Sequence, residues 1–374
     1  MRSTKFGHVA AAALAILCSG LPFTSSRADG VSTTVSGYGT VGGSFSDNGS
    51  YQYIHDVTEF KGASNHFDSG LDSRLGVQAV VDFGSGFSFT AQEVLRQRGN
   101  DALSPGTEWL FVQYLPTPSL SFRVGRFADD LFLMSDVLNV GYASPWFEAP
   151  NVVYGAGLFR FIDGGQFIGR TSMGDVSLKL DAAFGTNQAM IDAGGVLETI
   201  NAKNVSNIAV SLEYESLTFR LSRNVSQAPF VLPLSPTFVI STVTHDEFDS
   251  AGFQYDDGKA LVLSEFVRRK QNDVPVLDEP EAQFKSWYVA AGWRFGALTP
   301  LVTYGAVNPQ RSLVSPAGTF NSFAASIRYD VARNIALKAQ LSNAAAGNYD
   351  YWTVANPAST SRITVFGLGA DFVF

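Results

Sequence analysis

The chain has 374 residues, a formal net charge of −8 and a single cysteine, Cys18. This acidic balance argues against nucleic acid as a partner, and one cysteine excludes a disulfide within the chain. With 35 Gly, 30 Phe and 13 Tyr, the composition suits many half-apolar strands joined by glycine-rich turns, and no linker indicates a second domain.

The first 28 residues have the pattern of a secretory signal peptide. Arg2 and Lys5 precede an apolar run over residues 9–17, and the small residues Ser26 and Ala28 suit cleavage after position 28. This segment holds three basic and no acidic residues, so the remaining 23 basic and 34 acidic residues give −11. We expect one domain over residues 29–374, in which no stretch approaches the roughly 18 apolar residues of a membrane helix.

Segments of alternating apolar and polar residues recur along this domain, with short and long connections in turn. Asp257-Gly258 is the clearest short turn, because both central positions of a tight hairpin need positive φ. The pattern is typical of a transmembrane antiparallel β-barrel with short periplasmic turns and long outer loops. It predicts sixteen strands, with eighteen as the alternative. The short turns are expected at residues 84–86, 116–119, 173–175, 215–216, 257–258, 296–297 and 331–334. The long loops are expected near residues 46–67, 97–106, 126–160, 186–203, 224–246, 270–283, 305–317 and 343–359.

The two faces of the strands differ in charge. Phe122 and Val124 alternate with Ser121 and Arg123, and similar alternation recurs around residues 72–83, 176–184, 207–214 and 335–342. A soluble sandwich would also alternate, but here the polar set is charged in most strands. Arg or Lys facing the bilayer centre costs roughly 2–4 kcal/mol, so we expect these side chains to face a water-filled lumen. Glu93 does not fit, because it shares the parity of Phe87, Phe89 and Ala91; a β-bulge or a short strand would account for it.

Two other patterns carry no predicted chemistry. Residues 37–42 match GxGxxG, but more strand follows where a nucleotide-binding motif requires a helix. His55, His66 and His245 fall in expected loops. His55 precedes Asp56, and His245 precedes Asp246 and Glu247, yet no spacing implies a metal centre or an activated nucleophile. We expect exposed loop histidines, and no catalytic, cofactor or metal site. Loop carboxylates at residues 273–281 could bind cations that bridge lipopolysaccharide, although weak surface attraction is the simpler reading.

The connection over residues 126–160 is too apolar for a loose surface loop, with Phe132, Trp146 and Tyr154 among its side chains. Folding into the barrel would bury its apolar side and present Asp129, Asp130, Asp136 and Glu148 to the lumen. The wall opposite would supply Arg74, Arg96 and Arg123, with Arg126 at the base of the loop as a fourth basic residue. Opposed charges across a narrow passage set a transverse field that sorts solutes. An outward cap or a subunit contact is the alternative.

The last residues, SRITVFGLGADFVF, form an alternating strand that ends on an aromatic residue. Phe374, Phe372, Leu368 and Phe366 share one face, and small or polar residues occupy most of the other face. A terminal strand of this kind suits the closure of a barrel in lipid, where every backbone group needs a partner.

The chain resembles the Gram-negative outer-membrane porin superfamily over essentially its mature length. The resemblance rests on short motifs that occur in a fixed order: residues 73–76, 122–126, 135–136, 140–143, Trp146, 153–154, 328–330 and 371–374. The resemblance implies a third loop inside the barrel, a homotrimer, contact with outer-membrane lipid, and a final Phe374, with Phe372, read by the barrel-assembly machinery. Relatives usually have a basic residue and two prolines after the Trp, whereas this chain has Phe147-Glu148-Ala149-Pro150, which leaves the charge of the constriction open.

These observations predict an outer-membrane porin that passes small hydrophilic solutes and ions by diffusion, without cofactor or catalysis. A substrate-specific anion or phosphate channel is the first alternative, with Arg220, Arg294, Arg328 and Lys338 as a basic ladder. The same lumen would also hold four carboxylates, which weaken the case for an anion channel: Asp82, Asp181, Glu213 and Glu265. An enzyme or adhesin that uses the barrel as a scaffold is the second alternative.

Overall fold

The computed structural model describes residues 26–28, 30–49, 52–55, 58–59, 61–98, 102–155, 157, 159–192, 197–235, 238–273, 281–311, 320–345, 353–354 and 362–374. The predicted signal segment lies outside these residues except for Ser26–Ala28, which form a short strand, β1, paired with residues 31–33. The cleavage point therefore stays a prediction.

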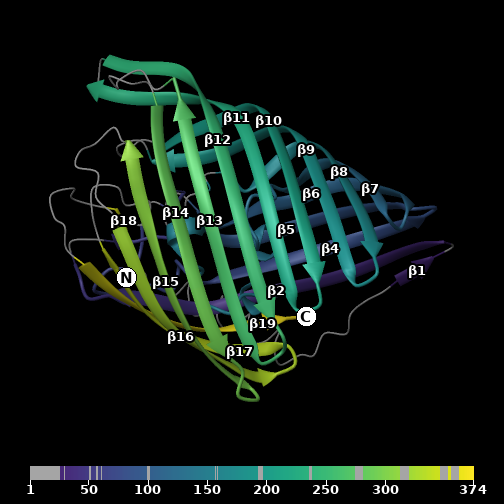
Figure 1. Cartoon of the computed structure of the whole chain (residues 1–374). Helices are drawn as coiled ribbons and strands as arrows, with labels where there is room; N and C mark the ends of the chain where they lie inside the picture. The colour runs from purple at the N-terminus through teal and green to yellow at the C-terminus, as the bar shows by residue number, and fades with distance from the viewer. Residues whose placement is uncertain are drawn as a thin grey trace.

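Sixteen antiparallel strands in the described part of the chain close into a barrel (Figure 1), as predicted. Each strand pairs with the next along the chain, and the last pairs with the first between residues 38–46 and 365–373. Closure leaves no sheet edge, which a membrane requires. The strands are β2 (Val31–Ser46), β4 (Arg74–Gly84), β5 (Phe87–Arg98), β6 (Ala102–Thr117), β7 (Leu120–Ala128), β8 (Phe161–Met173), β9 (Val176–Asp192), β10 (Leu197–Tyr214), β11 (Leu217–Ser235), β12 (Phe238–Asp256), β13 (Ala260–Asn272), β14 (Glu281–Trp293), β15 (Leu298–Arg311), β16 (Phe320–Ala332), β17 (Ile335–Ala345) and β19 (Arg362–Val373). A separate pair, β3 (Gln52–Tyr53) and β18 (Thr353–Val354), joins two loops.

All seven short turns lie where the sequence predicts them. One detail of the Asp257-Gly258 turn was wrong: Gly258 has φ +85°, but Asp257 is not among the residues with positive φ. Instead, the Asp257 carboxylate accepts backbone hydrogen bonds from Lys259 and Ala260 at 2.8 and 2.7 Å. A side chain thus shapes this turn and only one position needs glycine.

The outer ends of β9 to β12 run further than expected, and β11 and β12 meet again at residues 235 and 238 where a long loop was predicted. Figure 1 shows this pair of strands projecting past its neighbours. Its outward face is charged there: Arg223 contacts Asp249 and Glu247 at 2.9 and 2.7 Å. Ion pairs across the strands replace the apolar alternation, so the sequence pattern disappears while the strand continues.

The predicted faces of the strands are confirmed. Val124 is 70% exposed and Phe122 is 42% exposed, whereas Ser121 and Arg123 of the same strand are buried or half-buried. On β17 the outward Leu337 and Leu341 are exposed and the inward Lys338, Gln340 and Ser342 are buried. An outward belt of exposed apolar side chains with charges inside is the arrangement that lipid requires.

The GxGxxG segment has a structural use at the seam where the barrel closes. A Cβ atom on Gly37 or Gly39 would collide with the rings of Phe374 and Phe372, which lie across these glycines from the neighbouring strand. Phe372 is only 2% exposed although it shares the outward parity. The backbone of Gly37 also exchanges two hydrogen bonds with Phe374, at 2.8 and 2.9 Å. The terminal aromatics therefore pack against glycine in the first strand.

Glu93 lies on the outward face of β5, exposed, where the Thr107 hydroxyl donates a hydrogen bond to it. A bulge does occur here, because Gln92 pairs with Trp109 and Glu93 pairs with Thr107. The extra residue is Glu108 on β6, which turns inward and is 8% exposed. The bulge thus re-aims Glu108 and leaves Glu93 on the outside.

Candidate functional site: the third loop and the facing wall

Residues 129–160, which we call the third loop, connect β7 to β8. They contain two single-turn 3-10 helices, η1 (Ser135–Val137) and η2 (Gly141–Ala143), and one short helix, α2 (Asn151–Tyr154). Nowhere in the described part of the chain is there a helix long and apolar enough to span a bilayer. The third loop contacts inward-facing side chains of β2 and of β9 to β17, so it lies across the interior of the cylinder.

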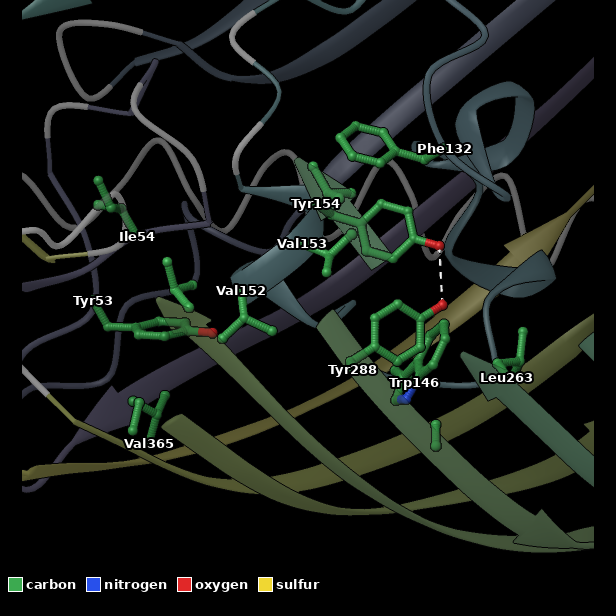
Figure 2. Close-up of a cluster of buried hydrophobic side chains, with 14 of the residues drawn as sticks. Tyr53, Ile54, Phe132, Trp146, Val152, Val153, Tyr154, Leu263, Tyr288 and Val365 are labelled. Carbon is green, nitrogen blue, oxygen red and sulfur yellow. Dashed lines mark hydrogen bonds between the residues drawn. The ribbon is translucent and has the colours of Figure 1, made fainter. Parts of the chain in front are cut away.

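An apolar cluster holds the loop against β12 to β15. Trp146, Val152 and Val153 are at most 1% exposed and pack with Leu263 and Tyr288 of the wall. Figure 2 shows the hydroxyl groups of Tyr154 and Tyr288 turned toward each other, at 3.3 Å. The indole nitrogen of Trp146 donates to the hydroxyl of Thr303 at 2.8 Å. The cluster fills this side of the barrel. Fully burying each such apolar side chain contributes roughly 1.5–3 kcal/mol to the stability of the docked loop.

A buried lysine of the wall fastens the next part of the loop. The ammonium group of Lys338 donates to the carbonyl oxygens of Gly141, Ser144 and Trp146 at 2.6, 2.7 and 3.0 Å. Its charge is balanced by Asp371 at 2.8 Å, and these two side chains are 1% and 2% exposed. Three carbonyl acceptors and one carboxylate occupy the donors of the ammonium group, which fixes the loop backbone.

The start of the loop is fastened to β10 and β11. The Asp129 carboxylate accepts hydrogen bonds from Asn207 and Asn224 at 2.8 and 2.9 Å. Burial and the neighbouring Asp130 carboxylate raise the pKa of Asp129 to about 7. Asp130 is paired with Arg220 at 2.5 Å and with Lys179 at 3.3 Å. These two carboxylates therefore anchor the loop and do not stand free in the lumen.

Phe147 and Glu148 attach the loop to the seam of the barrel. The ring of Phe147 lies on Gly42, Gly367 and Gly369, where a Cβ atom would meet it at 2.9 Å or closer. Glu148 is 5% exposed and lies 2.8 Å from the hydroxyl of Ser44. Burial and Asp72 raise the pKa of Glu148 to about 7.

The space left beside the loop faces β4 to β7. Arg74, Arg96, Leu138 and Glu148 line one cavity there, and Asp136 lines a second with Tyr38 and Glu108. Of the four predicted loop carboxylates, Asp136 alone has an exposed side chain, at 58%. It is thus the acidic group best placed to meet a solute.

The four predicted wall arginines are not equivalent. Arg74 hydrogen-bonds to Thr40 at 3.3 Å, and Arg123 to Gln113 and Gln166 at 2.7 and 3.3 Å, all neutral groups. Arg96 lies 3.8 Å from Glu108.

Arg126 lies apart from them. It pairs across the sheet with outward-facing Leu110 and forms two 2.7 Å hydrogen bonds to Asp163. The structure therefore brings Arg74, Arg96 and Arg123 to the inner wall and places Arg126 on the opposite face of β7.

The four basic residues predicted to form a ladder along the lumen are all paired with carboxylates. The pairs are Arg220 with Asp130, Arg294 with Asp256, Arg328 with Asp330, and Lys338 with Asp371. Paired cations attract a passing anion much less than unpaired ones.

Two of the three histidines are exposed, as predicted. His66 lies in a loop, whereas His245 lies on β12 and not in a loop, and its 53% exposed side chain contacts Asp273 at 2.6 Å. His55 lies in the loop between β2 and β4, and its side chain is 22% exposed between Glu59 and Asp72.

The sequence reading missed how the loop is held. On β13 to β15 the inward residues Leu263, Tyr288 and Leu301 are apolar and buried. The outward residues of the same strands are also largely apolar, but they are exposed. Apolar residues on both faces of adjacent strands could have indicated, from the sequence alone, that the third loop packs against these strands inside the barrel.

Comparison with known proteins agrees with this geometry. The family model described as Gram-negative porin matches residues 9–350. No curated protein sequence matches significantly. Among solved structures, OmpT of Vibrio cholerae has a TM-score of 0.63 at 13% identity, covering 94% of this chain and 100% of that one. The anion-selective porin from Comamonas acidovorans gives 0.59 at 13%, covering 92% and 100%. The outer-membrane channel DcaP of Acinetobacter baumannii gives 0.60 at 13%, covering 95% and 100%. The chain belongs to the Gram-negative porin family, whose members are outer-membrane channels.

Proposed function

We propose that this protein is a general porin that lets small hydrophilic solutes and ions diffuse passively across the outer membrane. No bond is made or broken, and no cofactor takes part. The observation that carries the proposal is the third loop, which packs against one side of the barrel, while cavities lined by Arg74 and Asp136 lie on the side of β4 to β7. The passage would run along that side. Width then excludes large solutes, and charge filters the smaller ones.

The charges of the filter would be Asp136 on the loop and Arg74, Arg96 and Arg123 on the wall. Arg74 and Arg123 hydrogen-bond to neutral partners, so their fields are not cancelled by these contacts. Asp136 is exposed, and Lys179 lies 4.0 Å away and offsets only part of its charge. Asp129, Asp130 and Glu148 would act as anchors of the loop. Export through a cleaved signal peptide is a proposal that rests on residues 1–28, and assembly as a homotrimer is a proposal that follows from the family.

A strongly anion-specific channel is the second candidate, because Arg74 and Arg123 of the inner wall hydrogen-bond to neutral groups. The pairing of Arg220, Arg294, Arg328 and Lys338 with carboxylates favours the general porin instead.

Planar-bilayer recording of the purified protein tests the proposal. We expect stepwise conductance that scales with salt, and a reversal potential in a salt gradient that shows weak selectivity. Asp136→Asn and Arg123→Gln should shift that potential in opposite directions. Arg223→Gln, on the outward face of β11, is the matched control and should leave it unchanged. Absence of any conductance would refute the channel, and near-ideal anion selectivity would refute the general porin.

A further inference from the structure

A compact set of metal-ligand atoms lies between the first loop, the third loop and the barrel wall. His55 and Asp72 come from the connection between β2 and β4, and Glu148 comes from the third loop. One ligand atom from each lies within 4.8 Å of the other two. His55 Nε2 and Asp72 Oδ1 are 3.2 Å apart. Three segments distant in sequence thus direct one imidazole and two carboxylates to one point.

Hydrogen bonding within the protein does not satisfy this set. Ser44 Oγ lies 2.8 Å from both Asp72 Oδ2 and Glu148 Oε1, but one hydroxyl can donate only one hydrogen bond. Glu148 Oε2 is buried and has no hydrogen-bond partner within range among the described residues, although the Tyr53 hydroxyl lies near this carboxyl group. His55 Nε2 is buried beside the Asp72 carboxylate at 3.2 Å. Glu148 is itself 95% buried, with 5% relative exposure. A buried carboxylate oxygen without a donor is costly, and it calls for a positive ligand.

The local charge leads to the same conclusion. Glu59, Asp72 and Glu148 are each 4–5% exposed, so a protonated His55 would leave the group at −2 with Glu148 ionised and at −1 with Glu148 protonated. Of the wall arginines that line the same cavity, Arg74 bonds to the neutral Thr40 and Arg96 faces Glu108, so neither is in direct contact with these carboxylates. Taking several like charges out of water without compensation is expensive.

We propose that His55, Asp72 and Glu148 bind a divalent transition-metal cation of the zinc class. Imidazole nitrogen with carboxylate oxygen suits zinc, whereas calcium and magnesium prefer oxygen alone. Glu59 lies 3.4 Å from His55 Nδ1 and would orient the ring with Nε2 toward the ion, as second partners of metal-binding histidines do. A cavity of about 70 Å³ adjoins these residues and has room for a water as fourth ligand.

Metal binding would have two consequences for the passage. It would tie the third loop to the first loop through Glu148 and His55, at a point where no backbone hydrogen bond between them is described. It would also neutralise negative charge beside Arg74 and Arg96, which line the same cavity. Zinc should therefore shift ionic selectivity toward anions.

Calorimetric titration of the full-length protein in detergent with zinc chloride tests the assignment. We expect one saturable site, with affinity at least tenfold lower in His55→Ala and in Glu148→Gln. His245→Ala is the control, because His245 also contacts an aspartate but lies on β12, and it should bind zinc as the wild type does. Glu148→Gln is nearly isosteric, and its heat-modifiable migration on gels shows whether the barrel has folded.

Failure of the wild type to bind zinc saturably would overturn the proposal, as would unchanged affinity in both site variants or a preference for calcium over zinc. Because the titration needs no conductance, its outcome is independent of the proposed channel activity.

Discussion

Lys338 offers the sharpest test of how the third loop is held. Lys338→Met removes an ammonium group that satisfies three carbonyl oxygens and one carboxylate, all in a buried environment. Breaking a buried ion pair by removing one partner costs about 3–5 kcal/mol, mostly because the other charge is left uncompensated. Since 1.4 kcal/mol is tenfold in an equilibrium, docking of residues 141–146 should weaken by roughly 10²- to 4 × 10³-fold.

Single-channel recording would show this as greater open-channel noise and a lower voltage threshold for closure in Lys338→Met. The double variant Lys338→Met/Asp371→Asn should recover part of the stability, because it removes the orphaned carboxylate while Thr40 still contacts position 371. The lost loop contacts should not return, so the noise should persist. Wild-type noise and threshold in Lys338→Met would show that the lysine does not hold the loop.

Three further outcomes follow from the structure. Burial raises the pKa of Asp129 to about 7, so the folded state binds the proton more tightly than the unfolded state and loses stability as pH rises from about 4 through 7. Asp129→Asn should abolish that loss of stability, which is on the order of 4 kcal/mol at most. Heat-modifiable gel migration measured against pH tests this, and an equal pH dependence of the wild type and the variant would contradict it. Gly39→Val should impair barrel closure because its side chain would meet Phe372, and Phe372→Ala should restore refolding yield in detergent; normal yield of Gly39→Val alone would exclude the steric role. Trp146→Phe should lower the melting temperature in detergent by several degrees through the lost hydrogen bond to Thr303 and lost volume, whereas an unchanged temperature would mean that the indole is not an anchor.

The barrel was predictable because lipid imposes a strict rule on its strands. Alternation, charged inner residues and glycine-rich turns recur often enough to give the number of strands and every short turn. Prediction failed where the outer solvent is water, as at Arg223 and Asp249, because polar residues on both faces leave no alternation to read.

The candidate site was predictable in kind but not in its contacts. Composition alone indicated that residues 126–160 fold inward, because an apolar loop needs a surface to cover. Which carboxylates face water depends on partners more than 70 positions away, such as Asn207 for Asp129 and Arg220 for Asp130. The face of Arg126 could have been read from strict alternation with Arg123, three residues earlier, which places the two on opposite sides of β7.

The two sides of the barrel interior have different roles: one binds the third loop and the other lines the remaining space. On β12 to β15 apolar wall residues such as Leu263 and Tyr288 receive the loop, so burial of hydrocarbon supplies the docking energy. On β4 to β7 the wall is polar, and Arg74 and Arg123 keep their charge beside the remaining space. A charge substitution at Arg123 should change what passes without loosening the loop, and an apolar substitution at Leu263 should loosen the loop without altering the charges. Selectivity and mechanical stability should therefore vary independently in variants of this porin.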